Sequence, residues 1–137
     1  MRKVKTMIVD DSPVQYMIIK QLVLCNPCLQ LYECTDAETD INVTIVREKI
    51  ELLILDVEMP KMNGFEFINA LKRPALIIMN STKSYFEIKA REYGADFFLK
   101  KPVNKKTFNR SIADVLIKHA LIETENEYRC IRYDELI

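Results

Sequence analysis

The sequence places acidic, hydroxyl and ammonium groups directly after short apolar runs. These groups are Asp10 and Asp11, Asp56, Ser81 and Lys101, and the apolar runs beside them cover residues 7–9, 52–55, 75–79 and 97–99. Unbroken apolar runs of this length are typical of strands that are covered on both faces of a parallel sheet. Because parallel strands end at the same edge, where ligands bind, we expect these side chains to lie close together.

Such a group of side chains has the chemistry for phosphoryl transfer. Neighbouring carboxylates repel one another, and a hard divalent ion such as Mg²⁺ relieves that repulsion with carboxylate, water and phosphate oxygens as ligands. The ammonium of Lys101 suits a phosphoryl oxygen, and the hydroxyl of Ser81 can donate to another. A carboxylate such as Asp56 can then act as the nucleophile. Each polar residue alone is more simply a solvated loop start, so the interpretation depends on the combination.

The segments between the apolar runs carry helical patterns. Ser12, Pro13 and Gln15 form a helix start, with Ser12 as the cap and Pro13 in the first position. We expect the apolar stripe of this helix to contain Val14, Met17, Ile18, Leu22 and Cys25. Further helices are predicted over 37–49, 65–73 and 85–93, and another begins near residue 104, while 29–34 fits a weak edge strand. Strands that alternate with helices predict an α/β fold with a parallel sheet between helices.

Composition excludes several other classes. The chain has 137 residues, a length that fits one domain, and a net charge of zero, which argues against a free-standing nucleic-acid binder. Two glycines are too few for a GxGxxG dinucleotide loop. The longest apolar run, 75–79, is far shorter than a membrane span, so we expect no membrane association and a cytoplasmic protein with reduced cysteines. We interpret Cys25, Cys28 and the single histidine, His119, as structural residues.

Three stretches carry a resemblance to a known family. They are MIVDDS at 7–12, LILDVEMPKMNG at 53–64 and GADFFLKKP at 94–102. The chain is similar to the response-regulator receiver domains of two-component signalling, CheY-like in fold, over about residues 3–121. The resemblance implies a three-layer, doubly wound, five-stranded parallel sheet in the flavodoxin-like order 2-1-3-4-5. It also implies a receiver domain over 1–122, followed by a tail over 123–137.

The resemblance assigns a role to each site residue. Asp56 resembles the phosphoacceptor, and Asp10 and Asp11 resemble the acidic pair that holds Mg²⁺ together with Asp56 and the backbone carbonyl of Glu58. Lys101 resembles the lysine that pairs with the phosphoryl group. In this family a histidine kinase or phosphotransfer protein supplies that group, and the receiver acts as a switch and not as an enzyme in the usual sense.

The switch residues and the mouth of the site are less regular. Ser81 resembles the switch hydroxyl and Phe98 the switch aromatic, although the short segment that follows Ser81 leaves Thr82 as an alternative hydroxyl. Glu58 and Lys83 each lie two residues beyond a site position. We expect them to pair across the mouth of the site and to hinder an attacking water, unless they are simply two solvated charges.

Two other classes of protein fit the sequence less well than a receiver domain. A hydrolase of the haloacid-dehalogenase type would need an Asp-x-Asp motif at Asp56, which the sequence lacks, and a phosphorylation-independent interaction domain would not need the intact acids and lysine. Residues 128–137 are similar to the start of LytTR-type DNA-binding output domains. We therefore expect a longer transcriptional regulator that reaches DNA only through an output domain beyond this chain. The sequence does not choose between a monomer and a homodimer.

Overall fold

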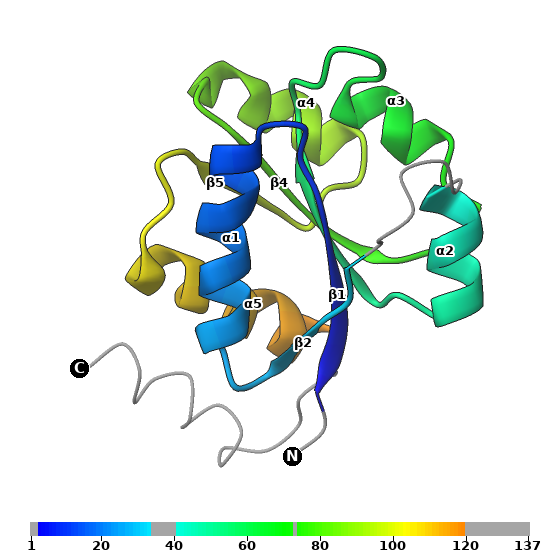
Figure 1. Cartoon of the computed structure of the whole chain (residues 1–137). Coiled ribbons are helices and arrows are strands. Elements are labelled where there is room, and N and C mark those ends of the chain that lie inside the picture. The colour runs from blue at the N-terminus through cyan, green and yellow to red at the C-terminus, as the bar shows by residue number, and fades with distance from the viewer. Residues whose placement is uncertain (1–2, 34–40, 73, 120–137) are drawn as a thin grey trace.

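A parallel sheet of five strands lies between two layers of helices (Figure 1). The computed structural model describes residues 3–33, 41–72 and 74–119. The strands are β1 (Val4–Val9), β2 (Leu29–Leu31), β3 (Leu52–Asp56), β4 (Leu76–Ser81) and β5 (Phe97–Lys100), in the order β2-β1-β3-β4-β5. The predicted fold class and strand order are therefore confirmed, and β2 is the short edge strand that the sequence indicated.

Side-chain alternation along the strands builds one apolar core on each face of the sheet. In β3, Leu52 and Ile54 pack in the core that α1 and α5 cover, whereas Leu53 and Leu55 pack in the core beneath α2, α3 and α4. All four of these side chains are fully buried. Two buried faces explain why the sequence of this strand is continuously apolar instead of alternating.

Two helices begin with capping residues at the starts that the sequence predicted. The helix α1 (Pro13–Cys25) follows Ser12, whose side chain accepts a hydrogen bond from the Gln15 amide, and α5 (Lys105–Lys118) follows Asn104, which caps the helix in the same way. The described part of α2 is Ile41–Glu48. Gly94, two residues after the end of α4, has a positive φ of 97°. The predicted residues 37–40 and the tail over 123–137 lie outside the described residues.

Two helices differ from their predicted bounds. The helix α3 covers only Gly64–Asn69, not 65–73, because the amides of Ala70 and Leu71 bond to carbonyls three residues back, which tightens and ends the last turn. The segment predicted as one helix over 85–93 is a short 3₁₀ turn, η1 (Ser84–Phe86), that leads into α4 (Glu87–Glu92). No helix in the described part of the chain has the length and apolarity to cross a membrane.

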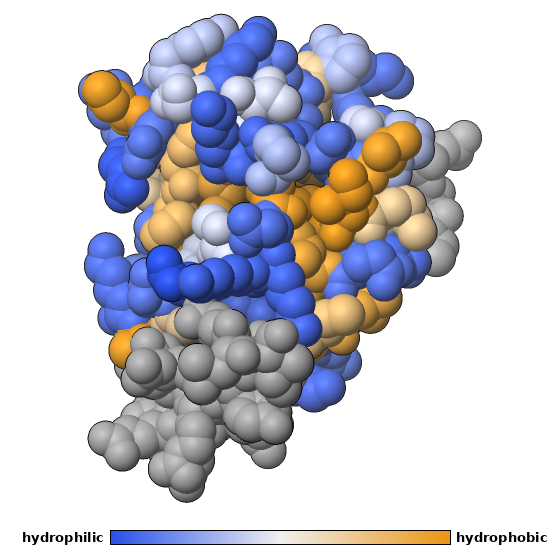
Figure 2. Space-filling view, turned by 90° about the vertical axis from the view of Figure 1, so that its left-hand side faces the viewer, coloured by the Kyte–Doolittle hydropathy of each residue, from blue (hydrophilic) through white to orange (hydrophobic). Residues whose placement is uncertain are grey.

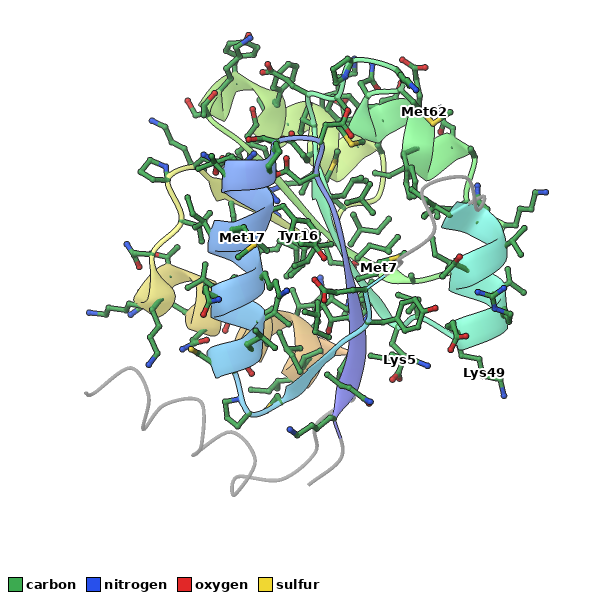
Figure 3. The ribbon with its side chains drawn as sticks, in the orientation of Figure 1. Lys5, Met7, Tyr16, Met17, Lys49 and Met62 are labelled. Carbon is green, nitrogen blue, oxygen red and sulfur yellow. The ribbon has the colours of Figure 1, made fainter. Side chains whose placement is uncertain are left out.

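The apolar stripe predicted for α1 is wrong at four of its five positions, because only Leu22 packs against the core. The residues that α1 buries are Ile19 and Val23, whereas Val14 is 67% exposed and Met17 is 49% exposed. Figure 3 shows Tyr16 pointing from α1 toward the strands, and Figure 2 shows hydrophobic side chains exposed on this side of the molecule. Because α1 has apolar residues on more than one side, periodicity alone does not distinguish its buried face from its exposed one.

Gly64 packs directly beneath the end of β3. A Cβ atom at this position would lie 2.7 Å from the Asp56 carbonyl oxygen and 2.6 Å from the Met79 Cε. The methionine side chain can move, but the backbone oxygen is fixed in the sheet. The close approach therefore requires a residue without a side chain at the start of α3.

We expect Gly64→Ala to lower the free energy of unfolding by about 1–3 kcal/mol, because the new methyl group must displace backbone in a packed region. Urea unfolding monitored by circular dichroism measures this change. Asn69→Ala, at an exposed position of the same helix, is the matched control and should be close to neutral. Equal stability of the Gly64 variant and the wild type would show that the backbone at this point is free to relax.

Candidate functional site

Three of the predicted site residues meet at the carboxyl edge of the sheet. Asp10 follows β1, Asp56 ends β3 and Lys101 follows β5. The Nζ atom of Lys101 lies 3.1 Å from Asp10 Oδ2 and 3.2 Å from Asp56 Oδ1. These three side chains, which are far apart in sequence, therefore form one cluster, and each is at most 9% exposed.

The carboxylates of Asp10 and Asp56 accept different hydrogen bonds besides those from Lys101. Asp10 accepts a second hydrogen bond, from the Ser12 amide at 2.9 Å, and Asp56 accepts one from the backbone amide of Glu58. Burial, and then the charge of Asp10, raise the pKa of the Asp56 carboxyl above its ordinary value, against the opposing effect of Lys101. The Lys101 ammonium, with a single positive charge, therefore contacts two buried carboxylates and cannot neutralise both of them.

The donor set of this edge suits a hard divalent cation. Asp10, Asp56, the neighbouring Asp11 and the backbone carbonyl of Glu58 offer only oxygen atoms, as Mg²⁺ prefers. Asp11 is exposed and lines a hollow of about 250 Å³ between β1 and the loop that follows β3. Within the described ranges, no three acidic, histidine or cysteine side chains form a ready-made metal cluster. An ion held here would complete its shell with water or phosphate oxygens.

Ser81 and Phe98 lie on neighbouring strands and on the same face of the sheet. Ser81 ends β4 and is 2% exposed, and its hydroxyl accepts a hydrogen bond from the Lys83 amide at 3.1 Å. Phe98 is buried in the core beneath α4, opposite Met79 in the strand register. Thr82 is exposed and lies outside the strand, so the geometry favours Ser81 over Thr82 as the hydroxyl of the site.

The expected ion pair at the mouth of the site is present. Lys83 Nζ lies 3.1 Å from Glu58 Oε1, and both side chains are 46% exposed. The contact joins the loop after β3 to the loop after β4. The sequence hypothesis of a pair between these residues is therefore confirmed as a contact, while its effect on the chemistry stays a prediction.

The histidine and the two cysteines that we interpreted as structural residues lie away from this edge. His119 caps the end of α5, and its Nε2 atom lies 3.1 Å from Asp96 Oδ1, where β5 begins. Cys28 is buried and Cys25 is exposed. Their positions agree with structural roles.

Sequence reasoning missed two features beside the site. Asn80, opposite Asp56 in the register, is 1% exposed, and its side-chain oxygen has no hydrogen-bond partner among the described residues. The only signal in the sequence was a polar residue directly after the apolar run at 75–79, where the strand β4 still continues. The second feature is an aromatic cluster of Phe65, Phe86 and Tyr93, whose members are too far apart in sequence to be grouped by pattern.

Comparison with known proteins identifies this architecture. The family model described as the response regulator receiver domain matches residues 6–113. A protein-glutamate methylesterase/protein-glutamine glutaminase of Pyrococcus abyssi is 32% identical over 125 residues, which cover 85% of this chain and 33% of that protein. A protein of the same name from Vibrio vulnificus is 33% identical over 107 residues, 74% of this chain and 31% of that protein. The chain thus spans about a third of the length of these curated relatives.

Solved structures give the same result. The chemotaxis protein CheY4 of Vibrio cholerae matches with a TM-score of 0.68 and 25% identity, over 83% of this chain and 99% of that one. A structure of CheY6 from R. sphaeroides in complex with the P1 domain of CheA3 matches with a TM-score of 0.68 and 26% identity, over 85% of this chain and 98% of that one.

The raised pKa of Asp56 leads to a pH-dependent stability prediction. Because the folded protein holds the Asp56 proton more tightly than the unfolded chain does, stability falls as pH rises from about 3.9, the ordinary Asp value, through the raised pKa. In the presence of a chelator, we expect Asp56→Asn to increase the free energy of unfolding by on the order of 1 kcal/mol at neutral pH. The gain should disappear at acid pH.

Urea unfolding of both proteins across this pH range measures the difference. Asp114→Asn, at an exposed position on α5, is the control and should show little dependence on pH. A variant less stable than the wild type at neutral pH would mean that Lys101 outweighs burial and Asp10.

Proposed function

Because this chain belongs to the response regulator receiver domain family, we propose that it is a phosphorylation-dependent switch whose phosphoacceptor is Asp56. The observation that carries the proposal is the buried contact of Lys101 with both Asp10 and Asp56 at the carboxyl edge of the sheet. The family supplies the class of protein, and this contact supplies the chemistry.

The proposed reaction transfers a phosphoryl group from a phosphohistidine. A carboxylate oxygen of Asp56 forms the new P–O bond, the P–N bond breaks, and its electron pair stays on the imidazole of the donor. Lys101, which already reaches Asp56, would pair with a phosphoryl oxygen. Positioning and charge neutralisation supply most of the catalysis in such transfers, so this small set of residues is sufficient.

Mg²⁺ is the metal ion that the proposal requires. Asp10, Asp11, Asp56 and the carbonyl of Glu58 are the residues proposed to hold it, and the bound ion would neutralise charge on the phosphoryl oxygens. The unbalanced negative charge of Asp10 and Asp56 supports this assignment.

Ser81 and Phe98 are proposed to report the modification to the surface. The Ser81 hydroxyl, near the end of β4, can turn toward a new phosphoryl oxygen, and the neighbouring ring of Phe98 can repack beneath α4. Because Phe98 has no hydroxyl, its contribution would come from packing alone.

The exposed face of α1 is proposed to receive the phosphodonor. Val14, Met17 and Ile18 are 41–67% exposed on the helix that begins directly after Asp11 and Ser12. Exposed apolar side chains beside a reactive site are typical of protein contact surfaces. The match to CheY6 bound to a CheA3 P1 domain supports a histidine kinase or phosphotransfer domain as the partner.

The output of the whole protein is also a proposal. The methylesterase name belongs to relatives of which this chain matches only a third, so we propose a switch without an enzymatic activity of its own. The similarity of residues 128–137 to LytTR-type domains supports a DNA-binding output domain after this chain. Sequencing the reading frame past Ile137 tests this directly, because a frame that encodes another kind of domain would exclude it.

We expect the protein to incorporate phosphate from a small-molecule phosphodonor in the presence of Mg²⁺, and the Asp56→Asn variant to incorporate none. Phosphate-affinity electrophoresis measures the product, and a chelator should abolish it. Asp114→Asn is the matched control and should be labelled like the wild type. Labelling of the Asp56 variant would overturn the assignment, and absence of labelling in the wild type would favour a phosphorylation-independent interaction domain.

The ion pair between Glu58 and Lys83 is expected to slow loss of the phosphoryl group by limiting access of water. Replacing both residues with Ala should increase the dephosphorylation rate by a factor of about 1.4 to 5, since exposed pairs contribute roughly 0.2–1 kcal/mol. The decay of labelled protein after removal of the donor gives the rate. The exposed pair of Glu87 and Arg91 on α4, replaced in the same way, is the control. An unchanged rate in the Glu58/Lys83 variant would end the hypothesis.

The role of α1 predicts a difference between phosphodonors. Replacing Val14 and Met17 with Ser should reduce transfer from a histidine-phosphorylated P1-type domain by at least about tenfold, because two apolar side chains lose their contacts. Transfer from the small-molecule donor should be unaffected. Ile117→Ser, an exposed position on α5, controls for surface polarity. Equal losses with both donors would mean that the substitutions damage the site itself.

A further inference from the structure

A second hollow lies on the other side of the loop that follows β3. It measures about 510 Å³, which is within the range of roughly 300–1,000 Å³ that small-molecule sites occupy. Val57 and Phe65 form its floor and are 1% and 4% exposed. Met59, Pro60 and Phe86 line its sides, so the interior is predominantly apolar.

The aromatic wall of the hollow is held in place by ring contacts. The ring of Phe65 lies 5.8 Å from that of Phe86 and 5.0 Å from that of Tyr93, in tilted arrangements. These contacts join α3 to the η1–α4 segment, and they are typical of stable aromatic packing. The wall is therefore a preformed surface on which another ring can pack.

The charges at the rim are unequal. The Glu58 carboxylate is neutralised by Lys83 at 3.1 Å. Lys89 Nζ lies over two rings, 4.6 Å from the centroid of Phe65 and 5.7 Å from that of Tyr93, and no carboxylate in the described part of the chain pairs with it. On the same helix, Glu87 pairs with Arg91 instead. The rim thus offers one ammonium without an anionic partner.

We propose that this hollow is a binding site for a small aromatic carboxylate. The ring of the ligand would pack between Met59 and Phe86, and its carboxylate would pair with the Lys89 ammonium at the rim. An apolar interior with a single polar anchor is the usual construction of such sites. The inference needs no phosphoryl transfer at Asp56 and stands or falls separately from the proposed function.

The probe for this site is 3-phenylpropanoate, titrated into the ¹⁵N-labelled full chain. We expect saturable shifts of the Phe65, Phe86 and Lys89 amide signals. Two matched probes separate the contributions: 3-phenylpropanamide keeps the ring without the charge, and butanoate keeps the charge without the ring. Each should bind about tenfold more weakly, as expected for loss of a charge-assisted contact or of an apolar group.

Variants assign the binding to the hollow. Lys89→Met, which keeps an apolar side chain at an exposed position, should weaken 3-phenylpropanoate about tenfold and leave the amide probe unchanged. Lys118→Met, at the far end of α5, should change neither, and Asp56→Asn should bind like the wild type, so that failure of phosphorylation leaves the test intact. Absence of saturable shifts up to about 10 mM, weaker than typical specific binding, would overturn the proposal. Equal affinity of the two aromatic probes, or of the Lys89 variant and the wild type, would also overturn it.

Discussion

One ammonium that reaches two buried carboxylates is the interaction on which the carboxyl edge depends. Lys101 follows β5, whereas Asp56 ends β3, and β4 lies between these strands. Since neighbouring strands are about 4.8 Å apart, the lysine must cross the end of β4 to make its 3.2 Å contact. The residues beneath this path, Asn80 and Ser81, are polar and almost fully buried, and the Ser81 carbonyl accepts the Lys101 amide at 2.8 Å. The last residues of β4 therefore also position Lys101, through this backbone hydrogen bond.

Two ion pairs of the same chemistry differ in strength because they differ in burial. The contacts of Lys101 lie where side chains are less than a tenth exposed, so water competes little, and removing Lys101 would leave two buried carboxylates without a counter-charge. The pair of Glu58 and Lys83 is about half exposed, and solvent screening makes it weak. The contacts of Lys101 can therefore keep a fixed geometry. The pair of Glu58 and Lys83 can open and close at the mouth of the site at a small cost in free energy.

The sequence was sufficient to predict the features that a single strand or cap determines. The apolar runs located the strand ends, so Asp10, Asp56 and Lys101 could be placed at one edge, and Ser12 located the start of α1. The sequence did not predict features that are determined by tertiary packing, such as which face of a helix is buried. Most of the buried face of α1, including Ile19 and Val23, was missed because the helix is apolar on several sides. The end of α3 was missed because its last turn tightens before Pro74. The aromatic wall exists only because distant segments meet.

The loop after β3 connects these features mechanically. The Val57 amide donates to the Asn80 carbonyl and its carbonyl accepts from the Gly64 amide, at 3.1 and 2.8 Å, so the loop is fixed to β4 and to the start of α3. The same loop carries Asp56 at its beginning and then, within three residues, the side chain that pairs with Lys83 and a wall of the larger hollow. Val57, which directly follows Asp56, already lines the hollow. Any shift of this loop would have to move a backbone that the close approach of Gly64 leaves little room to shift.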